Sequence, residues 1–204
     1  MVSAGLTPRS SGAPTACKQA RSAVRSIFRS PGLLASRRRP LSSNVRPHKN
    51  SPHGSNMHIL PYEPADAIEL VNMWRASFEH GVGIKDPNAI EGQISYFRNQ
   101  VVMENQVRVV KDKNSIVAFL AFNSDSVSQL YVRVQNIGRG LGSRLLGIAK
   151  TESNGSLWLY TFAQNSNARR FYEKHGFLEV ERESENMYKL EAIKYQWLRS
   201  ASGA

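Results

Sequence analysis

The sequence predicts an α/β fold, in which a sheet with mixed strand directions is flanked by helices. Short segments with the two-residue period of strands alternate along the chain with segments that repeat apolar residues at helical spacing. Three alternate glycines, Gly138, Gly140 and Gly142, lie between one such strand and one such helix. The expected order is β-α-α-β-β-β-α-β-α-β-β, within one domain over residues 58–204.

The domain opens with a short strand and two helices. His58–Tyr62 alternates in polarity, and Pro64 is well placed to begin a helix that continues to about His80. Asn88, with Glu91 three residues later, resembles a capping box and is expected to open the second helix. The apolar stripes of the two helices are Ile68, Val71, Trp74 and Phe78, and then Ile90, Ile94, Phe97 and Val101.

Strands and helices then alternate to the end of the chain. A strand around Val107 and Val109 forms a hairpin with Asn114–Phe122, and a long strand over Val127–Val134 leads into the glycines and the next helix. Leu157–Thr161 is apolar on both faces, as an interior strand should be. The remaining expected elements are a helix over Asn165–His175 and strands over Phe177–Arg182 and Ile193–Trp197.

Charge is distributed very unevenly along the chain. The 204 residues include 27 Lys and Arg against 16 Asp and Glu, a formal net charge of +11. Residues 1–57 hold ten of the basic side chains and no acidic one, which leaves 17 basic and 16 acidic side chains for residues 58–204. The domain is therefore nearly neutral, and we expect no nucleic-acid partner. Since no apolar run approaches the roughly 18–20 residues of a membrane span, we expect no membrane partner either.

Residues 1–57 form a basic tail rich in Ser, Arg and Pro, which is not expected to fold. Three interpretations stay open: a transit peptide, supported by the amphipathic stretch 20–29; translated sequence upstream of a true start at Met57; or an RNA- or membrane-binding arm. The second is favoured, because strand-like chemistry begins abruptly at Met57. The expected location is the cytoplasm, or the mitochondrial matrix if the tail is a transit peptide. The only cysteine, Cys17, lies in the tail, so the domain has no disulfide and no cysteine nucleophile.

The glycine-rich stretch points to a pyrophosphate. Glycines at a strand–helix junction let backbone N–H groups approach an anion, and the helix aims its positive end at the same place. The stretch lacks the lysine of a P-loop, and its G-x-G-x-G spacing after a fourth strand differs from a Rossmann fingerprint. The alternative is a glycine-rich connection without a ligand.

A second motif follows about 25 residues later. It reads Asn165-Ser-Asn-Ala168-Arg-Arg-Phe171-Tyr172-Glu-Lys-His-Gly-Phe177. On a helix, Ala168 and Tyr172 lie one turn apart on the same face. Taken alone, Tyr172 could be a half-buried core aromatic, and Asn165 a simple helix cap.

Together the two motifs resemble the GNAT family, the Gcn5-related N-acetyltransferases, over essentially all of residues 58–198. The resemblance implies a GNAT-like mixed, mostly antiparallel sheet flanked by helices, with acetyl-CoA as co-substrate and no metal. It implies that the strand edge at Leu130, Tyr131 and Val132 binds the pantetheine arm, and that Asn165 either contacts the same arm or stabilises the end of the splayed strand. The N–H groups that would hold the pyrophosphate belong to Gly138, Arg139, Gly140, Leu141, Gly142 and Ser143.

The resemblance also implies a reaction. An amine of a small molecule or peptide would attack the thioester directly in a ternary complex, and Tyr172 would protonate the departing CoA thiolate. The absence of a cysteine from the domain agrees with direct attack. Candidates for the general base are Glu79 and His80, at the end of the first helix, with Ser128 and Gln129 as weaker ones. An exposed, solvated pair at a helix end is the simpler interpretation of Glu79 and His80.

Two functions follow from these residues. The first is an acetyl-CoA-dependent N-acetyltransferase acting on a primary amine. The alternative is a catalytically silent acyl-CoA-binding regulatory module, slightly favoured by Ile137, which offers the loop no polar side chain. The specificity segments implied by the resemblance are Trp74–Tyr96 and Glu183–Glu191. A homodimer is left open by the apolar alternation of Ile193 to Trp197.

Overall fold

The computed structural model describes residues 57–184 and 186–200. Predictions that concern residues 1–56, including the tail and Cys17, lie outside the described residues. Within the described residues, five α-helices and seven strands follow the order that the periodicity predicts, with α2, η3 and α3 together standing for the second predicted helix. Short 3-10 and π turns lie between some of them. The elements are β1 (Met57–Pro61), η2 (Pro64–Asp66), α1 (Ala67–Val82), α2 (Ile90–Tyr96), η3 (Phe97–Val101), α3 (Val102–Glu104), β2 (Gln106–Asp112), β3 (Ser115–Phe122), β4 (Val127–Val132), η4 (Val134–Asn136), α4 (Leu141–Glu152), β5 (Ser156–Phe162), α5 (Ser166–Lys174), β6 (Leu178–Glu183) and β7 (Ala192–Leu198).

The strands form two antiparallel sheets that meet at one point. One sheet has the order β1-β2-β3-β4 and the other the order β5-β7-β6. A single parallel bridge between Ser126 and Trp158 joins them among the described residues. The predicted fold class, a mixed and mostly antiparallel sheet flanked by helices, is confirmed.

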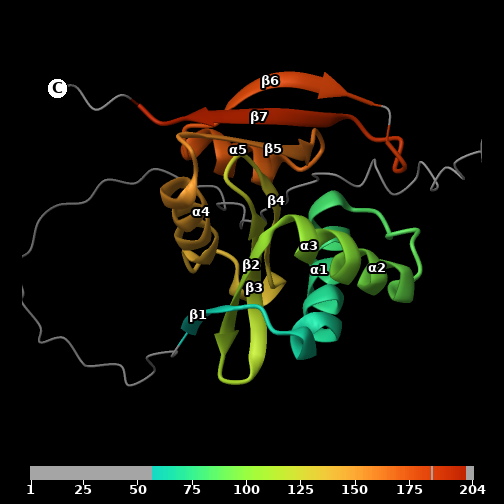
Figure 1. The fold of residues 1–204 in the computed structure, drawn as a ribbon. Coiled ribbons are helices and arrows are strands. Elements are labelled where there is room, and N and C mark those ends of the chain that lie inside the picture. The colour runs from blue at the N-terminus through green and yellow to red at the C-terminus, as the bar shows by residue number, and fades with distance from the viewer. Residues whose placement is uncertain (1–56, 185, 201–204) are drawn as a thin grey trace, which may run out of the picture.

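Helices cover both faces of the sheet β1-β2-β3-β4, and α5 covers one face of the sheet β5-β7-β6 (Figure 1). α4 and α5 pack on one core, which includes Leu145, Leu159 and Tyr172. α1 and the segment from α2 to α3 pack on a second core, which includes Trp74 and Phe119. Neighbouring residues of β3 and β4 contribute to different cores because successive side chains of a strand point to opposite faces. Each of these strands is therefore apolar on both faces.

Several element boundaries differ from the prediction for identifiable reasons. Asn88 is not a helix cap: its N–H and its side-chain amide both donate to Oδ1 of Asp86, at 3.0 and 2.7 Å, and Ala89 precedes α2 instead. β4 ends at Val132 rather than Val134, because Val134–Asn136 forms a 3-10 turn, in which the N–H of Asn136 donates to the carbonyl of Arg133. The second helical stripe continues past Tyr96 as a π turn.

The position of β5 in its sheet differs from the prediction. β5 was predicted as an interior strand, but its hydrogen-bond ladder runs only to β7 within the described part of the chain. β7 is the central strand, and Ile193 and Tyr195 are fully buried in the chain's own cores. The alternation that left room for a homodimer is therefore accounted for by packing within one chain.

Candidate functional site

The glycine loop forms an exposed turn in front of α4. Gly138 and Gly140 have φ angles of 81° and 78°, the left-handed region that residues with a β-carbon rarely adopt. Both are exposed, and a Cβ atom built on either would meet no described atom within 4 Å. The loop is therefore open to an approaching group at both glycines.

The first turn of α4 offers backbone donors to that opening. Gly140 is its N-cap and supplies no side-chain cap, so among the described residues no cap side chain covers the helix end. The first N–H groups of a helix have no carbonyl partner within it, and they carry the positive end of its dipole. Leu141 is buried, whereas Arg139 and Ser143 are exposed. The predicted pyrophosphate loop thus has the geometry of a backbone anion site.

β4 and β5 separate next to this loop. They share the bridge at Ser126 and Trp158, and beyond it β4 pairs only with β3 in the described structure. Leu130, Tyr131 and Val132 lie in this separated stretch and are at most 2% exposed. The carbonyl of Val132 accepts a hydrogen bond from Oγ of Ser77 at 3.1 Å, which ties α1 to the end of β4.

Four of the five buried side-chain polar atoms without a partner among the described residues lie on the elements around the separation, the fifth being Oδ1 of Asn105 before β2. The four are Gln129 Oε1 on β4, Thr161 Oγ1 on β5, Asn165 Nδ2 before α5 and Tyr172 Oη on α5. Buried polar groups are almost always hydrogen-bonded, and an unmade bond costs about 1–3 kcal/mol. These donors and acceptors fit a ligand that carries amides and a carbonyl, as the acetylated pantetheine arm of acetyl-CoA does.

Tyr172 is the most deeply buried of the predicted catalytic residues. Its side chain has no exposed surface, and its ring lies 5.7 Å from Phe177 and 6.3 Å from Tyr195. Burial raises the pKa of Tyr172 well above its usual value, with a smaller contribution from Tyr131 on β4. The phenol therefore keeps its proton at neutral pH, where it can act as an acid but not as a base.

Asn165 caps α5 through one half of its side-chain amide. Its Oδ1 accepts a hydrogen bond from the N–H of Ala168 at 3.1 Å, and the residue is 2% exposed. The simpler interpretation of Asn165 as a helix cap is thus correct for Oδ1, while Nδ2 stays without a described partner. The cap fixes where α5 begins and hence where Tyr172 lies.

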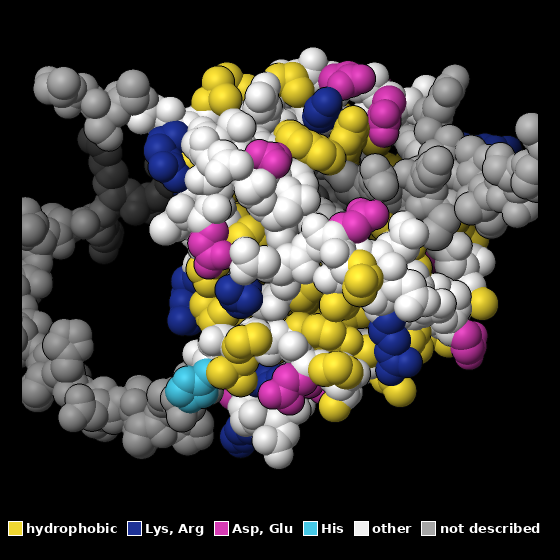
Figure 2. All heavy atoms as spheres, viewed as in Figure 1, with side chains coloured by type: hydrophobic (Ala, Val, Ile, Leu, Met, Phe, Trp, Pro, Cys, Tyr) yellow, Lys and Arg dark blue, Asp and Glu magenta, His cyan; other side chains and the backbone are white. Residues whose placement is uncertain are grey.

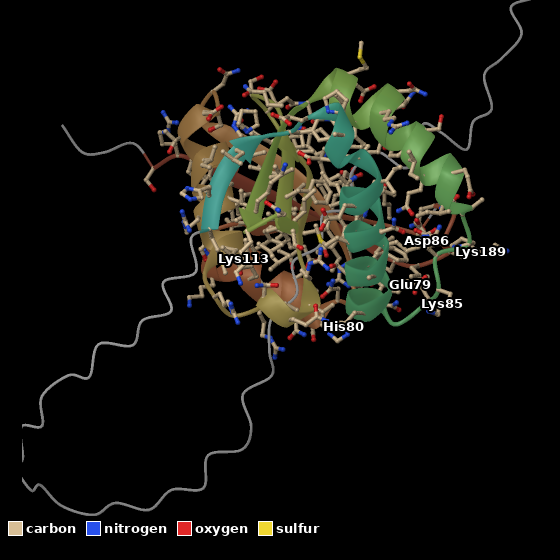
Figure 3. The ribbon with its side chains drawn as sticks, turned by 90° about the horizontal axis from the view of Figure 1, so that it is seen from below. Glu79, His80, Lys85, Asp86, Lys113 and Lys189 are labelled. Carbon is tan, nitrogen blue, oxygen red and sulfur yellow. The ribbon has the colours of Figure 1, made fainter. Side chains whose placement is uncertain are left out.

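The end of α1 lies beside the start of α5. Nε2 of Gln164 donates to the carbonyl of Val82 at 2.6 Å, which joins the last residue of α1 to the residue before Asn165. The two general-base candidates are therefore on an element that borders the separated strands. Figure 3 shows Glu79, Lys85 and Asp86 close together there, with Lys189 near them and His80 apart from them.

Glu79 and His80 differ in their surroundings. Glu79 pairs with Lys85 at 2.7 Å and accepts a hydrogen bond from the N–H of Asp86 at 3.2 Å. The hydrogen bond from Lys85 is the main reason that the pKa of Glu79 is lowered. A carboxylate with a lowered pKa is a weaker base. The Glu79 carboxylate also binds Lys85 and Asp86, and so it fixes the connector between α1 and α2. His80 is exposed at the next position.

Some polar residues near the separated strands did not stand out in the sequence. Leu157, Leu159 and Thr161 lie on the same face of β5, and Thr161 is the polar residue among them. A polar residue on an otherwise apolar face is the sequence signal that could have marked Thr161. Gln129 was a weaker general-base candidate, and the structure buries it at 2% exposure. Ile137 is half-buried and packs against the core that α4 covers.

Over residues 57–184 and 186–200, no group of three or more His, Cys, Asp or Glu side chains is arranged to hold a metal ion. The same residues contain no helix that is both long enough and apolar enough to span a membrane. Figure 2 shows Lys and Arg side chains interspersed with Asp and Glu on the face in view, as expected for a nearly neutral domain.

Comparison with solved structures identifies the fold. The apo form of YjaB from Escherichia coli matches with a TM-score of 0.59 and 18% identity, over 71% of this chain and 99% of that one. An N-acetyltransferase from Staphylococcus aureus Mu50 matches with a TM-score of 0.57 and 19% identity, over 71% and 99%. The yncA protein of Salmonella typhimurium, solved with its cofactor acetyl-CoA, matches with a TM-score of 0.55 and 15% identity, over 72% and 96%.

Comparison of the sequence leads to the same family. Residues 103–179 match the family model described as an acetyltransferase (GNAT) domain. This range contains β4, the glycine loop, α4 and α5, and so both motifs of the sequence. No curated protein matches the sequence significantly. The resemblance is confirmed: residues 103–179 match the GNAT domain model, and the fold is shared with solved acetyltransferases.

Proposed function

We propose that the protein is an acetyl-CoA-dependent N-acetyltransferase that acts on a primary amine of a small molecule or peptide. Acetyl-CoA supplies an acetyl group activated as a thioester. The amine attacks the thioester carbonyl directly, the C–S bond breaks, and CoA leaves as a thiol once it has gained a proton.

Binding of acetyl-CoA would use three parts of the site. The N–H groups from Gly138 to Ser143 would hold the pyrophosphate, since this helix end has an open loop and no side-chain cap among the described residues. The edge of β4 from Leu130 to Val132 would hydrogen-bond the pantetheine arm. Nδ2 of Asn165 would donate to the same arm.

Tyr172 would supply the proton that the thiolate needs. Its buried hydroxyl is protonated at neutral pH and has no described partner that competes for its hydrogen. This unsatisfied hydroxyl, next to two strands that separate, is the observation that carries the proposal. A residue that only filled the core would not need a hydroxyl group there.

The reaction also needs a base that accepts the proton of the amine. Glu79 and His80 remain the candidates because the end of α1 borders Asn165 through Gln164. The ion pair of Glu79 with Lys85 favours His80, or a water molecule that it activates, as the acceptor. Ammonium groups must lose a proton before they attack, so His80→Gln should shift the pH profile of turnover upward.

We propose that the reaction occurs in the cytoplasm, with the mitochondrial matrix as the alternative if residues 1–57 act as a transit peptide. N-terminal sequencing of the natural protein tests this: a chain that begins at Met1 or Met57 has lost no transit peptide, whereas one that begins at another residue of the tail has been cleaved.

The proposal is tested by thiol release from acetyl-CoA with a panel of primary amines. The expected result is amine-dependent release for at least one class of amine, together with acetylated amine detected by mass spectrometry. Acetyl-CoA binding without transfer to any amine would instead indicate the silent regulatory module. Absence of acetyl-CoA binding would contradict both functions.

A further inference from the structure

A group of contacts beside the glycine loop joins the start of α4 to the end of α5. His175, the residue that closes α5, is half-buried, and its imidazole lies between two oxygen atoms. Nδ1 is 2.7 Å from the carbonyl oxygen of Phe171, and Nε2 is 3.0 Å from Oγ of Ser143. The imidazole also lies 4.3 Å from the ring of Phe171. It is thus fixed on α5 and reaches across to α4.

The contact with Phe171 determines where the proton of a neutral His175 lies. A carbonyl oxygen only accepts, so Nδ1 carries the hydrogen and donates it. Nε2 of the neutral imidazole then has a free lone pair and accepts a hydrogen bond from the hydroxyl of Ser143. In this state the hydroxyl of Ser143 donates its hydrogen to Nε2 of His175 and cannot donate it to another acceptor.

Ser143 lies where the proposed pyrophosphate would bind. It is the third residue of α4, and side chains of a helix lean toward its N-terminus, so Oγ lies on the side of the open N–H groups. An anion held by those N–H groups would face a lone pair of Oγ. The hydroxyl must therefore turn before it can donate to the anion.

The residues next to His175 and Ser143 in the chain are mostly basic. Nζ of Lys150 donates to the carbonyl oxygen of His175 at 2.5 Å, Lys174 precedes His175, and Arg144 follows Ser143. The neighbouring carboxylate, Glu173, is engaged in accepting a hydrogen bond from the hydroxyl of Tyr195 at 2.8 Å. A bound pyrophosphate would reverse this balance and favour a second proton on the imidazole.

We propose that His175 is a positioning residue for the pyrophosphate and that it takes up a proton when acetyl-CoA binds, an inference that rests on the proposed function. A proton from solvent bonds to Nε2, and the new N–H donates to Oγ of Ser143. The Ser143 hydroxyl turns and donates its own hydrogen to a pyrophosphate oxygen. The N–H bond is the only covalent bond formed, and the positive charge on His175 offsets part of the ligand's charge.

The test is calorimetric titration of the full chain with acetyl-CoA at about pH 7.5. This pH lies within the range of about 5 to 8 in which the charge of a histidine side chain can change. The titration is run in HEPES and in Tris, whose ionisation enthalpies differ. Uptake of roughly half a proton or more makes the measured binding enthalpy depend on the buffer. Equal enthalpies in the two buffers, with binding intact, would overturn the inference.

Variants separate His175 from other sources of protons. His175→Gln can hydrogen-bond to Ser143 but does not titrate, so it should lose the buffer dependence and bind acetyl-CoA about tenfold more weakly. Ser143→Ala should also lose most of the dependence, whereas Ser143→Thr should keep it. His58→Gln on β1 is the matched control and should behave as the unchanged protein.

The outcomes also distinguish this inference from the proposed function. Buffer dependence that survives in His175→Gln would assign the proton to another group and overturn the inference alone. Absence of any binding heat in either buffer, with no thermal stabilisation, would overturn the proposed function together with the inference.

Discussion

The two helices that follow β4 and β5 begin in opposite ways. α4 starts at Gly140, which is exposed, left-handed and without a side chain to cap the helix. α5 starts at Asn165, which is 2% exposed and whose Oδ1 accepts a hydrogen bond from Ala168. Each helix leaves its first N–H groups without carbonyl partners. α5 satisfies one of them from within the protein, whereas α4 leaves its own open to a ligand.

On the proposed function, the start of α5 serves the fold and the start of α4 serves ligand binding. The closed start of α5 fixes the position of Tyr172, and the open start of α4 presents backbone donors. Changes at α5 should therefore affect stability or the chemical step, and changes at α4 should affect affinity for acetyl-CoA.

The largest expected effect is that of Tyr172→Phe. Loss of the acid should lower turnover by about 10²–10⁴-fold. The free energy of unfolding without ligand should rise by about 1 kcal/mol or stay constant, since a buried hydroxyl without a described partner is removed. Steady-state kinetics and urea unfolding measure the two quantities. Unchanged turnover at every pH would show that Tyr172 is not the acid.

A pair of substitutions at Gly140 tests the open helix end. Asp and Asn both tolerate the left-handed region and have similar size, so each should cost about 1 kcal/mol of stability relative to glycine. Only Gly140→Asp places a negative charge beside the pyrophosphate, and it should bind acetyl-CoA about tenfold more weakly than Gly140→Asn. Equal dissociation constants for the two variants would argue against an anion at this helix end.

A pair of substitutions at Asn165 tests the closed helix end. Asn165→Ala removes the cap and should lower the free energy of unfolding by about 1–2 kcal/mol. Asn165→Asp retains the acceptor for the N–H of Ala168 but loses Nδ2, so it should keep most of the stability while its KM for acetyl-CoA rises. Denaturant unfolding and kinetics on the same preparations separate these roles. If Asn165→Asp keeps the unchanged KM, Asn165 serves the fold alone.

The smallest effect concerns alkaline pH. Because the pKa of Tyr172 is raised by burial, the folded state keeps this proton after the unfolded chain has lost it. The stabilisation from this proton is fully present below about pH 10, the ordinary pKa of tyrosine in the unfolded chain. Above that pH the free energy of unfolding falls by about 1.4 kcal/mol per pH unit, until the pH passes the pKa of the folded state. Unfolding free energies at a series of alkaline pH values should therefore fall less steeply for Tyr172→Phe. Parallel curves would show that Tyr172 titrates as an ordinary tyrosine.

Local patterns predicted most of the fold and the position of the glycine loop. The left-handed turns at Gly138 and Gly140 follow from residues next to one another in the sequence. The failure of the capping box at Asn88 depends on a competing carboxylate, Asp86, two residues away. The spacing of Asn88 and Glu91 favours a capping box, but it does not show that the Asn88 amide binds Asp86 instead of capping the helix.

Other features depend on contacts between distant segments, which periodicity does not encode. The motif marks Tyr172, but its complete burial arises from packing against β6 and β7 neighbours such as Phe177 and Tyr195. The contact of His175 with Ser143 spans 32 residues of the sequence. Likewise, Lys85 lowers the pKa of Glu79 only because the α1–α2 connector turns back on the helix.

The central claim, that the open start of α4 binds the pyrophosphate of acetyl-CoA, is tested most directly by thermal unfolding with two ligands. Acetyl-CoA and S-acetylpantetheine share the thioester and the pantetheine arm, but only acetyl-CoA has the pyrophosphate. At a concentration 100 times its Kd, acetyl-CoA should stabilise the protein by about 2.7 kcal/mol. S-acetylpantetheine at the same concentration should raise the Tm far less. Equal rises in Tm, or no rise with either ligand, would contradict the claim.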